Sequence, residues 1–165
     1  MTGANLERFL MAQDQGHPSQ LEQARSELRS GRKVSHWIWF VLPQLRDLGR
    51  SELARRYGIA DLEEARAYLA DPLLRERLED VIAVIADQLR QPGQSLRLLM
   101  GGELDAAKTI SCLTLYEAAG LQSATALLDE IGHRCRRTRA LLNPQLASST
   151  GGSSATTCRT PSSSR

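Results

Sequence analysis

The sequence predicts an all-α protein, with a single compact multihelical domain and a disordered C-terminal tail. Several segments repeat apolar residues at spacings of three and four, which is typical of one buried helix face. Segments of alternating apolar and polar residues do not stand out, and β-branched residues are sparse. A length of 165 residues with 41% hydrophobic residues suits one domain with a real core.

The expected helices begin where a side chain can cap the first turn and end near glycine or proline. In chain order, the expected starts are Asn5, Ser19, Leu48, Asp61, Asp71, Asp105 and Ser123. The expected ends lie near Gly16, Gly31, Gly58, Leu69, Arg90, Gly120 and Ile131. The strongest starts are Asp61, with Glu64 three residues later, and Asp71, with proline at the next position. We expect the helical domain to span residues 5–142.

Residues 34–42 are the one ambiguous segment, because a short apolar run rich in aromatic residues also suits a buried strand. Helix is the preferred interpretation, since all neighbouring segments are helical. Pro43 lacks the backbone donor that would reach the Trp39 carbonyl, so the helix should kink or stop there. On such a helix His36, Trp39 and Phe40 would share one face.

Most of the large aromatic rings fall within this segment. Both tryptophans, one of two phenylalanines and one of three histidines lie between positions 36 and 40. Aromatic rings beside His36 and Gln44 could stack on a base or a sugar and hydrogen-bond to it. The alternative is that Trp37 and Trp39 build the core, with their indole N–H groups satisfied internally.

A second candidate cluster is Asp105, Lys108 and Ser111, whose spacing of three places them along one stripe of a helix. The surrounding residues are apolar nearly all round, so this helix should be central and Lys108 partly desolvated. Such a lysine could bind an anionic ligand or act as a base. The alternative is an Asp105–Lys108 ion pair at the helix start.

Together the two clusters predict a pocket between the 33–44 segment and the 105–116 helix, with Lys33 at its rim. The expected ligand-binding residues are Lys33, His36, Trp37, Trp39, Gln44, Lys108 and Ser111, and His36 and Lys108 are the catalytic candidates. The first hypothesis is binding or processing of a small anionic, nucleotide-like ligand. The alternative is a non-catalytic protein-interaction or structural module without a small-molecule site.

Charge and cysteine usage limit the other function classes. Residues 1–130 hold 15 basic and 19 acidic side chains, whereas residues 131–165 hold six arginines and no acid. The basic, Ser/Thr-rich tail at 147–165 is expected to be disordered. Nucleic acid is not expected as a partner, except through this tail. Three unpaired cysteines and three distant histidines predict no disulfide framework, no metal site and no cofactor. We expect a cytoplasmic protein that does not span a membrane.

Several motifs resemble the bacterial domain-of-unknown-function 1810 family. They are Leu6-x-Arg8-Phe9-x-x-Ala12-Gln13, then Gly31-Arg32-Lys33-x-Ser35-His36-Trp37-x-Trp39-Phe40-x-x-Pro43-Gln44, then Ala65–Leu69 with Asp71-Pro72-Leu73, and Asp105-x-x-Lys108 leading to Ser111 and Thr114–Tyr116. The resemblance spans about residues 5–142 and implies a compact all-helical fold with no established activity. This chain departs from the family at Cys112, Leu113 and Tyr116, where the family usually has Ser, Met and Phe.

Overall fold

The computed structural model describes the backbone of residues 5–149 and the side chains of residues 5–144. The all-α prediction is confirmed over this range, where the only β-type pairing is an isolated parallel bridge between Leu45 and Ile59. The helices are α1 Glu7–Asp14, α2 Gln20–Arg29, α3 Ile38–Val41, the 3-10 helix η1 Arg46–Leu48, α4 Glu52–Tyr57, α5 Leu62–Ala70, α6 Pro72–Leu89, α7 Leu96–Leu99, α8 Glu103–Ala118, α9 Gln122–Ile131 and α10 Arg136–Ser149.

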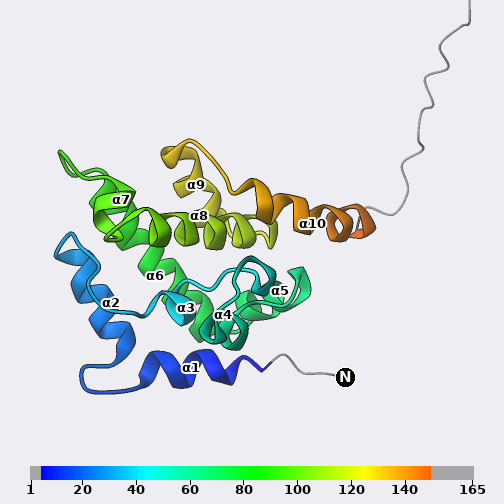
Figure 1. The fold of residues 1–165 in the computed structure, drawn as a ribbon, viewed down its shortest axis with the longest axis horizontal. Coiled ribbons are helices and arrows are strands. Elements are labelled where there is room, and N and C mark those ends of the chain that lie inside the picture. Colours follow the sequence, from blue (N-terminus) through cyan, green and yellow to red (C-terminus); the bar gives the residue numbers. More distant parts are fainter. Residues whose placement is uncertain (1–4, 150–165) are drawn as a thin grey trace, which may run out of the picture.

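Helix α8 is the centre of the fold (Figure 1). It contacts α3, α5 and α7, and also α9 and α10. In the view of Figure 1, α9 lies on one side of α8, α10 runs on beyond one end of it, and α1 to α5 lie on the other side. The long helix α6 makes the second set of central contacts, with α2, α5, α7 and α9.

The burial of α8 follows from its composition, and its predicted central place is confirmed. Every residue from Thr109 to Tyr116 is buried. The Ser and Thr hydroxyl groups inside this stretch are satisfied locally, because Thr109, Ser111 and Thr114 each donate to the carbonyl four residues earlier. A helix can therefore carry Ser and Thr side chains through a core without leaving their protons unpaired. The buried Tyr116 hydroxyl, in contrast, has no hydrogen-bond partner among the described residues.

Three of the expected helix starts are confirmed by side-chain caps. Ser19 and Glu22 form a capping box, Asp61 accepts from the Glu64 N–H at 2.8 Å, and Asp71 accepts from the N–H groups of the first turn of α6. Ser51 and Ser95 cap α4 and α7. The short α7 was not predicted, because four residues are too few to show a period.

The other expected starts are wrong. Helix α1 begins after Leu6 without a side-chain cap, and α9 begins after Leu121. Helix α8 begins three residues earlier than expected, after Gly102, whose φ of 150° suits glycine. Asp105 thus lies inside the first turn of α8, where its carboxylate is free to pair with a distant lysine.

The segment around the tryptophans is less helical than expected. Only Ile38–Val41 forms a helix, and residues 32–37 run as an irregular strap across the ends of α2 and α7. The predicted helix from Leu48 to Tyr57 is also divided, into η1 and α4. Gly49 lies at the break, where an added Cβ would be 2.4 Å from the Cβ of Ala54.

Helix α10 extends beyond the expected end of the domain. Its backbone is helical through Ser149, so residues 147–149 of the expected disordered tail are helical. The remainder of that prediction, residues 150–165, lies outside the described residues. Within the part of the chain that the structure describes, no helix has the length and apolar character needed to cross a bilayer.

Gly58 joins α4 to the bridge that closes the 44–59 region. The Ile59 N–H donates to the Gln44 carbonyl at 2.9 Å, and the Arg46 N–H donates to the Ile59 carbonyl at 2.8 Å. A Cβ on Gly58 would lie 2.4 Å from the Ala54 carbonyl oxygen and 2.5 Å from the Arg46 Cα. Both neighbours are backbone atoms, so the bridge itself would have to move.

We therefore expect Gly58→Ala to lower the free energy of unfolding by about 2–3 kcal/mol, as overpacking of a tight site does. Urea unfolding followed by circular dichroism measures this loss. Gly93→Ala is the matched control, because no atom lies within 4 Å of its Cβ position and only its positive φ of 76° opposes the change. That control should cost about 1 kcal/mol. Equal losses at the two positions would contradict the predicted clash.

Candidate functional site

The carboxylate of Glu27, on α2, organises the strap that precedes α3. It accepts the Val34 N–H at 2.9 Å and the Ser35 N–H at 3.0 Å. It also accepts the Trp37 indole N–H at 2.8 Å. Gln23, one turn earlier on α2, donates to the Ser35 hydroxyl at 2.7 Å. These bonds hold residues 34–37 against α2 in an irregular path, and the helix begins only at Ile38.

The two tryptophans have different roles. Trp37 is fully buried, and its indole N–H is satisfied by Glu27. The alternative prediction, that Trp37 belongs to the core, is therefore confirmed. Trp39 is only partly buried and packs against the edge of the core. His36 lies on the strap with an exposed side chain, and it does not share a helix face with Trp39.

Lys33 is buried, whereas the sequence placed it at the rim of a pocket. Its side chain is 5% exposed, and its ammonium lies 2.8 Å from Asp105 Oδ2. The same group donates to the Ser35 carbonyl at 2.6 Å and lies 5.1 Å from the centre of the Trp37 ring. Its backbone N–H donates to the Leu99 carbonyl at 2.7 Å, which ties the strap to α7. The rim assignment fails because Asp105 draws the ammonium inward.

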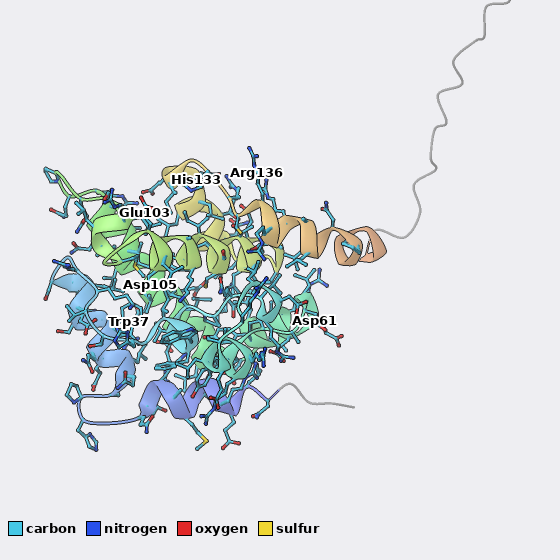
Figure 2. All side chains as sticks on the ribbon, viewed as in Figure 1. Trp37, Asp61, Glu103, Asp105, His133 and Arg136 are labelled. Carbon is cyan, nitrogen blue, oxygen red and sulfur yellow. The ribbon has the colours of Figure 1, made fainter. Side chains whose placement is uncertain are left out.

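Lys108 shares the same carboxylate from the opposite side. Its ammonium lies 3.5 Å from Asp105 Oδ1, and its side chain is 21% exposed. It also lies 4.9 Å from the centre of the Trp39 ring, within the range of a cation–π contact. Figure 2 shows Asp105 near the segment that carries Trp37. Two ammonium groups therefore meet at one carboxylate, and Lys33 makes the closer contact.

The exposed end of Lys108 opens into a narrow cleft between α3, α4 and α8. The residues that line it are Ile38, Trp39, Leu42, Gln44, Ala54, Tyr57, Gly58 and Lys108. The cleft has room for about 10 Å³, roughly one water molecule. Three of the predicted site residues, Trp39, Gln44 and Lys108, are thus brought together.

The structure does not bring the remaining predicted residues to this cleft. Lys33 and Trp37 lie behind it with their polar atoms engaged. Ser111 donates to the Ala107 carbonyl and contacts Cys135 Sγ at 3.3 Å. Within the described residues, no group of three or more His, Cys, Asp or Glu side chains is placed to hold a metal ion.

Glu27 is the site residue that the sequence did not reveal. It follows Ala24 by three residues and precedes Leu28, so it borders the apolar face of α2. A carboxylate beside an apolar stripe was the available signal. It was weak, because a border position on a helix is usually a solvated one.

The ionisation of Glu27 is coupled to folding. Burial raises the pKa of this carboxyl, but the hydrogen bonds from Ser35, Val34 and Trp37 outweigh burial and lower the pKa from 4.5 to about 2. A carboxyl whose pKa is lower in the folded state stabilises the fold above its unfolded pKa. That contribution is lost as the pH falls from about 4.5 to about 2.

We expect Glu27→Gln to lower the free energy of unfolding by about 2–3 kcal/mol at pH 7, because the amide loses charge-assisted hydrogen bonds. Urea unfolding at a series of pH values should show the difference from the unsubstituted protein shrinking between pH 4.5 and 2.

Glu22→Gln, on the same helix, is the control for this change. Glutamine also completes a capping box, so this variant should lose little stability at pH 7. A pH-independent loss in Glu27→Gln would show that the carboxylate charge is not what holds the strap.

Comparison with known proteins gives one family and one solved structure. The family model described as "Protein of unknown function (DUF1810)" matches residues 3–142. The crystal structure of the conserved hypothetical protein Rv1873 from Mycobacterium tuberculosis is similar, with 42% sequence identity and a TM-score of 0.75. The similarity covers 85% of this chain and 97% of that chain. No match was found among curated proteins.

Proposed function

For this chain, which belongs to the DUF1810 family of proteins of unknown function, we propose binding of a small anionic molecule at the Trp39–Gln44–Lys108 cleft. The ligand would present one carboxylate or phosphate group to the Lys108 ammonium. Binding is the proposed activity, and no reaction is assigned to the site. His36, the other catalytic candidate, is not among the residues that line the cleft.

The observation that carries this proposal is the uneven sharing of Asp105. Its carboxylate carries one negative charge, so it can fully neutralise only one of the two ammonium groups. Lys33 makes the shorter contact, 2.8 Å against 3.5 Å for Lys108. Lys33 is also the more deeply buried of the two, so it depends more on that partner. Lys108 therefore keeps an incompletely neutralised charge at the mouth of the cleft, where an anion would complete the pairing.

The chemistry of the walls supports an anionic group attached to a flat or apolar body. The Trp39 ring lies under the Lys108 ammonium and offers a face for stacking. Gln44 supplies a carboxamide that can donate to an anion oxygen. The room of about 10 Å³ limits how much of the ligand enters. A nucleotide could place only its edge there unless Lys108 and Gln44 moved aside.

The alternative of a protein-interaction module also has an observation in its favour. Three large aliphatic side chains near the start of α8 are exposed: Val34 at 74%, Leu98 at 57% and Leu104 at 72%. Leu98 shares a second, open cleft with Arg32 and Gly101. Exposed apolar residues near one corner are a feature of surfaces that contact other proteins.

Iodide quenching of tryptophan fluorescence tests the anion site directly, because iodide is both an anion and a quencher. Trp37 is fully buried, so Trp39 should be the residue that is quenched. We expect Lys108→Met to reduce quenching by iodide at least about twofold while quenching by neutral acrylamide is unchanged. Inorganic phosphate should protect the unsubstituted protein from iodide.

Arg97→Met is the matched control, because it removes an exposed positive charge away from the cleft. Its iodide quenching should equal that of the unsubstituted protein. Thermal unfolding establishes that both variants fold. If Lys108→Met leaves iodide quenching unchanged, or if phosphate gives no protection, the anion proposal fails. The interaction module then becomes the better interpretation.

A further inference from the structure

A thiol lies against hydroxyl groups on another face of α8, at the start of α10. Cys135 immediately precedes α10 and is partly exposed. Its backbone N–H donates to Thr114 Oγ1 at 3.0 Å, and its Sγ lies 3.3 Å from Ser111 Oγ. The Thr138 N–H, in the first turn of α10, donates to the sulfur at 3.5 Å. The sulfur is therefore held between two helices by donors.

A second observation concerns Thr138, three residues after Cys135. The residue is fully buried, yet within the described part of the chain its hydroxyl makes no well-directed hydrogen bond. A buried hydroxyl without an acceptor costs free energy. The N–H of the same residue donates to the sulfur, which places Thr138 beside it, and the Thr138 hydroxyl lowers the pKa of the thiol. A thiolate is the acceptor that this hydroxyl lacks.

The protons around the sulfur can be accounted for in both states. In the thiol state, the Ser111 hydroxyl donates to the Ala107 carbonyl and can accept from the S–H group. In the thiolate state the Ser111 proton can turn to the sulfur. Burial raises the pKa of Cys135, but the Ser111 and Thr138 hydroxyls and the Thr138 and Arg137 N–H groups outweigh burial and lower it below its ordinary value.

The charged groups around the start of α10 leave a positive surplus. Arg134 pairs with Glu117 of α8 at 2.8 Å and with Asp129 of α9 at 2.6 Å. Arg139 shares Glu117 at 3.3 Å. Two further arginines, Arg136 and Arg137, are exposed and form no ion pair with any described residue. In Figure 2, Arg136 and His133 lie on the far side of α8 from Trp37.

We propose that Cys135 is a thiolate-forming site of thiol–disulfide exchange that takes small, anionic disulfides as its co-reactant. The Cys135 thiolate attacks one sulfur of the disulfide R–S–S–R. The new Sγ–S bond forms as the old S–S bond breaks, and R–S⁻ leaves and takes a proton from water. The product is a mixed disulfide on Cys135, and a second thiol reverses the step. Arg136 and Arg137 favour an anionic R group.

The test uses the full chain with Cys158→Ser, which leaves Cys112 and Cys135 as the only thiols. The probe is dithiobis(nitrobenzoate), an anionic disulfide that releases one coloured thiolate for each thiol that reacts. The folded protein should release one equivalent. Cys112 is fully buried, and burial raises its pKa, so it should react only after unfolding in guanidinium. Adding Cys135→Ala should abolish the release from the folded protein.

Thr138→Val separates a role at the sulfur from a role in the fold. It removes a buried hydroxyl that has no well-directed partner, so the melting temperature should be kept or raised. The pH midpoint of the exchange rate should nevertheless rise. The rate at pH 7 should fall about threefold per unit of that rise, because the loss of thiolate outweighs its gain in nucleophilicity.

Two further arms complete the test. Ser111→Ala should also raise the pH midpoint, and Arg137→Gln should slow the reaction with dithiobis(nitrobenzoate) but not with the neutral dithiodipyridine. The proposal is overturned if the folded protein releases no colour, or if Thr138→Val leaves both the rate and the midpoint unchanged. It is also overturned if Cys135 reacts no faster at pH 7 than a short unstructured peptide containing residues 133–138.

Discussion

The candidate site depends on the hydrogen bonds that the Glu27 carboxylate accepts. It draws two backbone N–H groups and the Trp37 indole to one point beside α2. Burying a carboxylate is costly, and several donors with good geometry offset that cost. Because these donors belong to residues 34–37, the strap is held beside α2 there, and α3 begins only at Ile38. The positions of Lys33 and Trp39 on either side of Trp37 follow from this anchoring of the strap to Glu27.

Helix α8 connects the two chemical features of the molecule. Its first turn carries the Asp105 carboxylate, which two lysines share, and its middle carries the hydroxyl groups that face Cys135. Both features sit where a buried helix meets a partly exposed segment. A central helix is held by partners on several sides, so the polar groups at its edges keep fixed positions. Fixed polar groups bind charge with little reorganisation.

Local signals in the sequence predicted most helices correctly, because caps and prolines act within a few residues. The capping box at Ser19 and the Asp71–Pro72 start are examples. Asp105 shows where such signals fail. A carboxylate just before an apolar helix resembles a cap, but its closer partner is Lys33, 72 positions earlier in the chain. No local pattern contains a contact of that range.

The sequence by itself determined that this chain is helical and that the helix following Asp105 is central. It determined these points because helix period, capping and composition are local properties. Only the tertiary structure decided which lysine is buried, which tryptophan lines the cleft, and that Ser111 faces a thiol. Those outcomes depend on which of several distant groups reaches one carboxylate or one cavity, and the packing of the helices decides that.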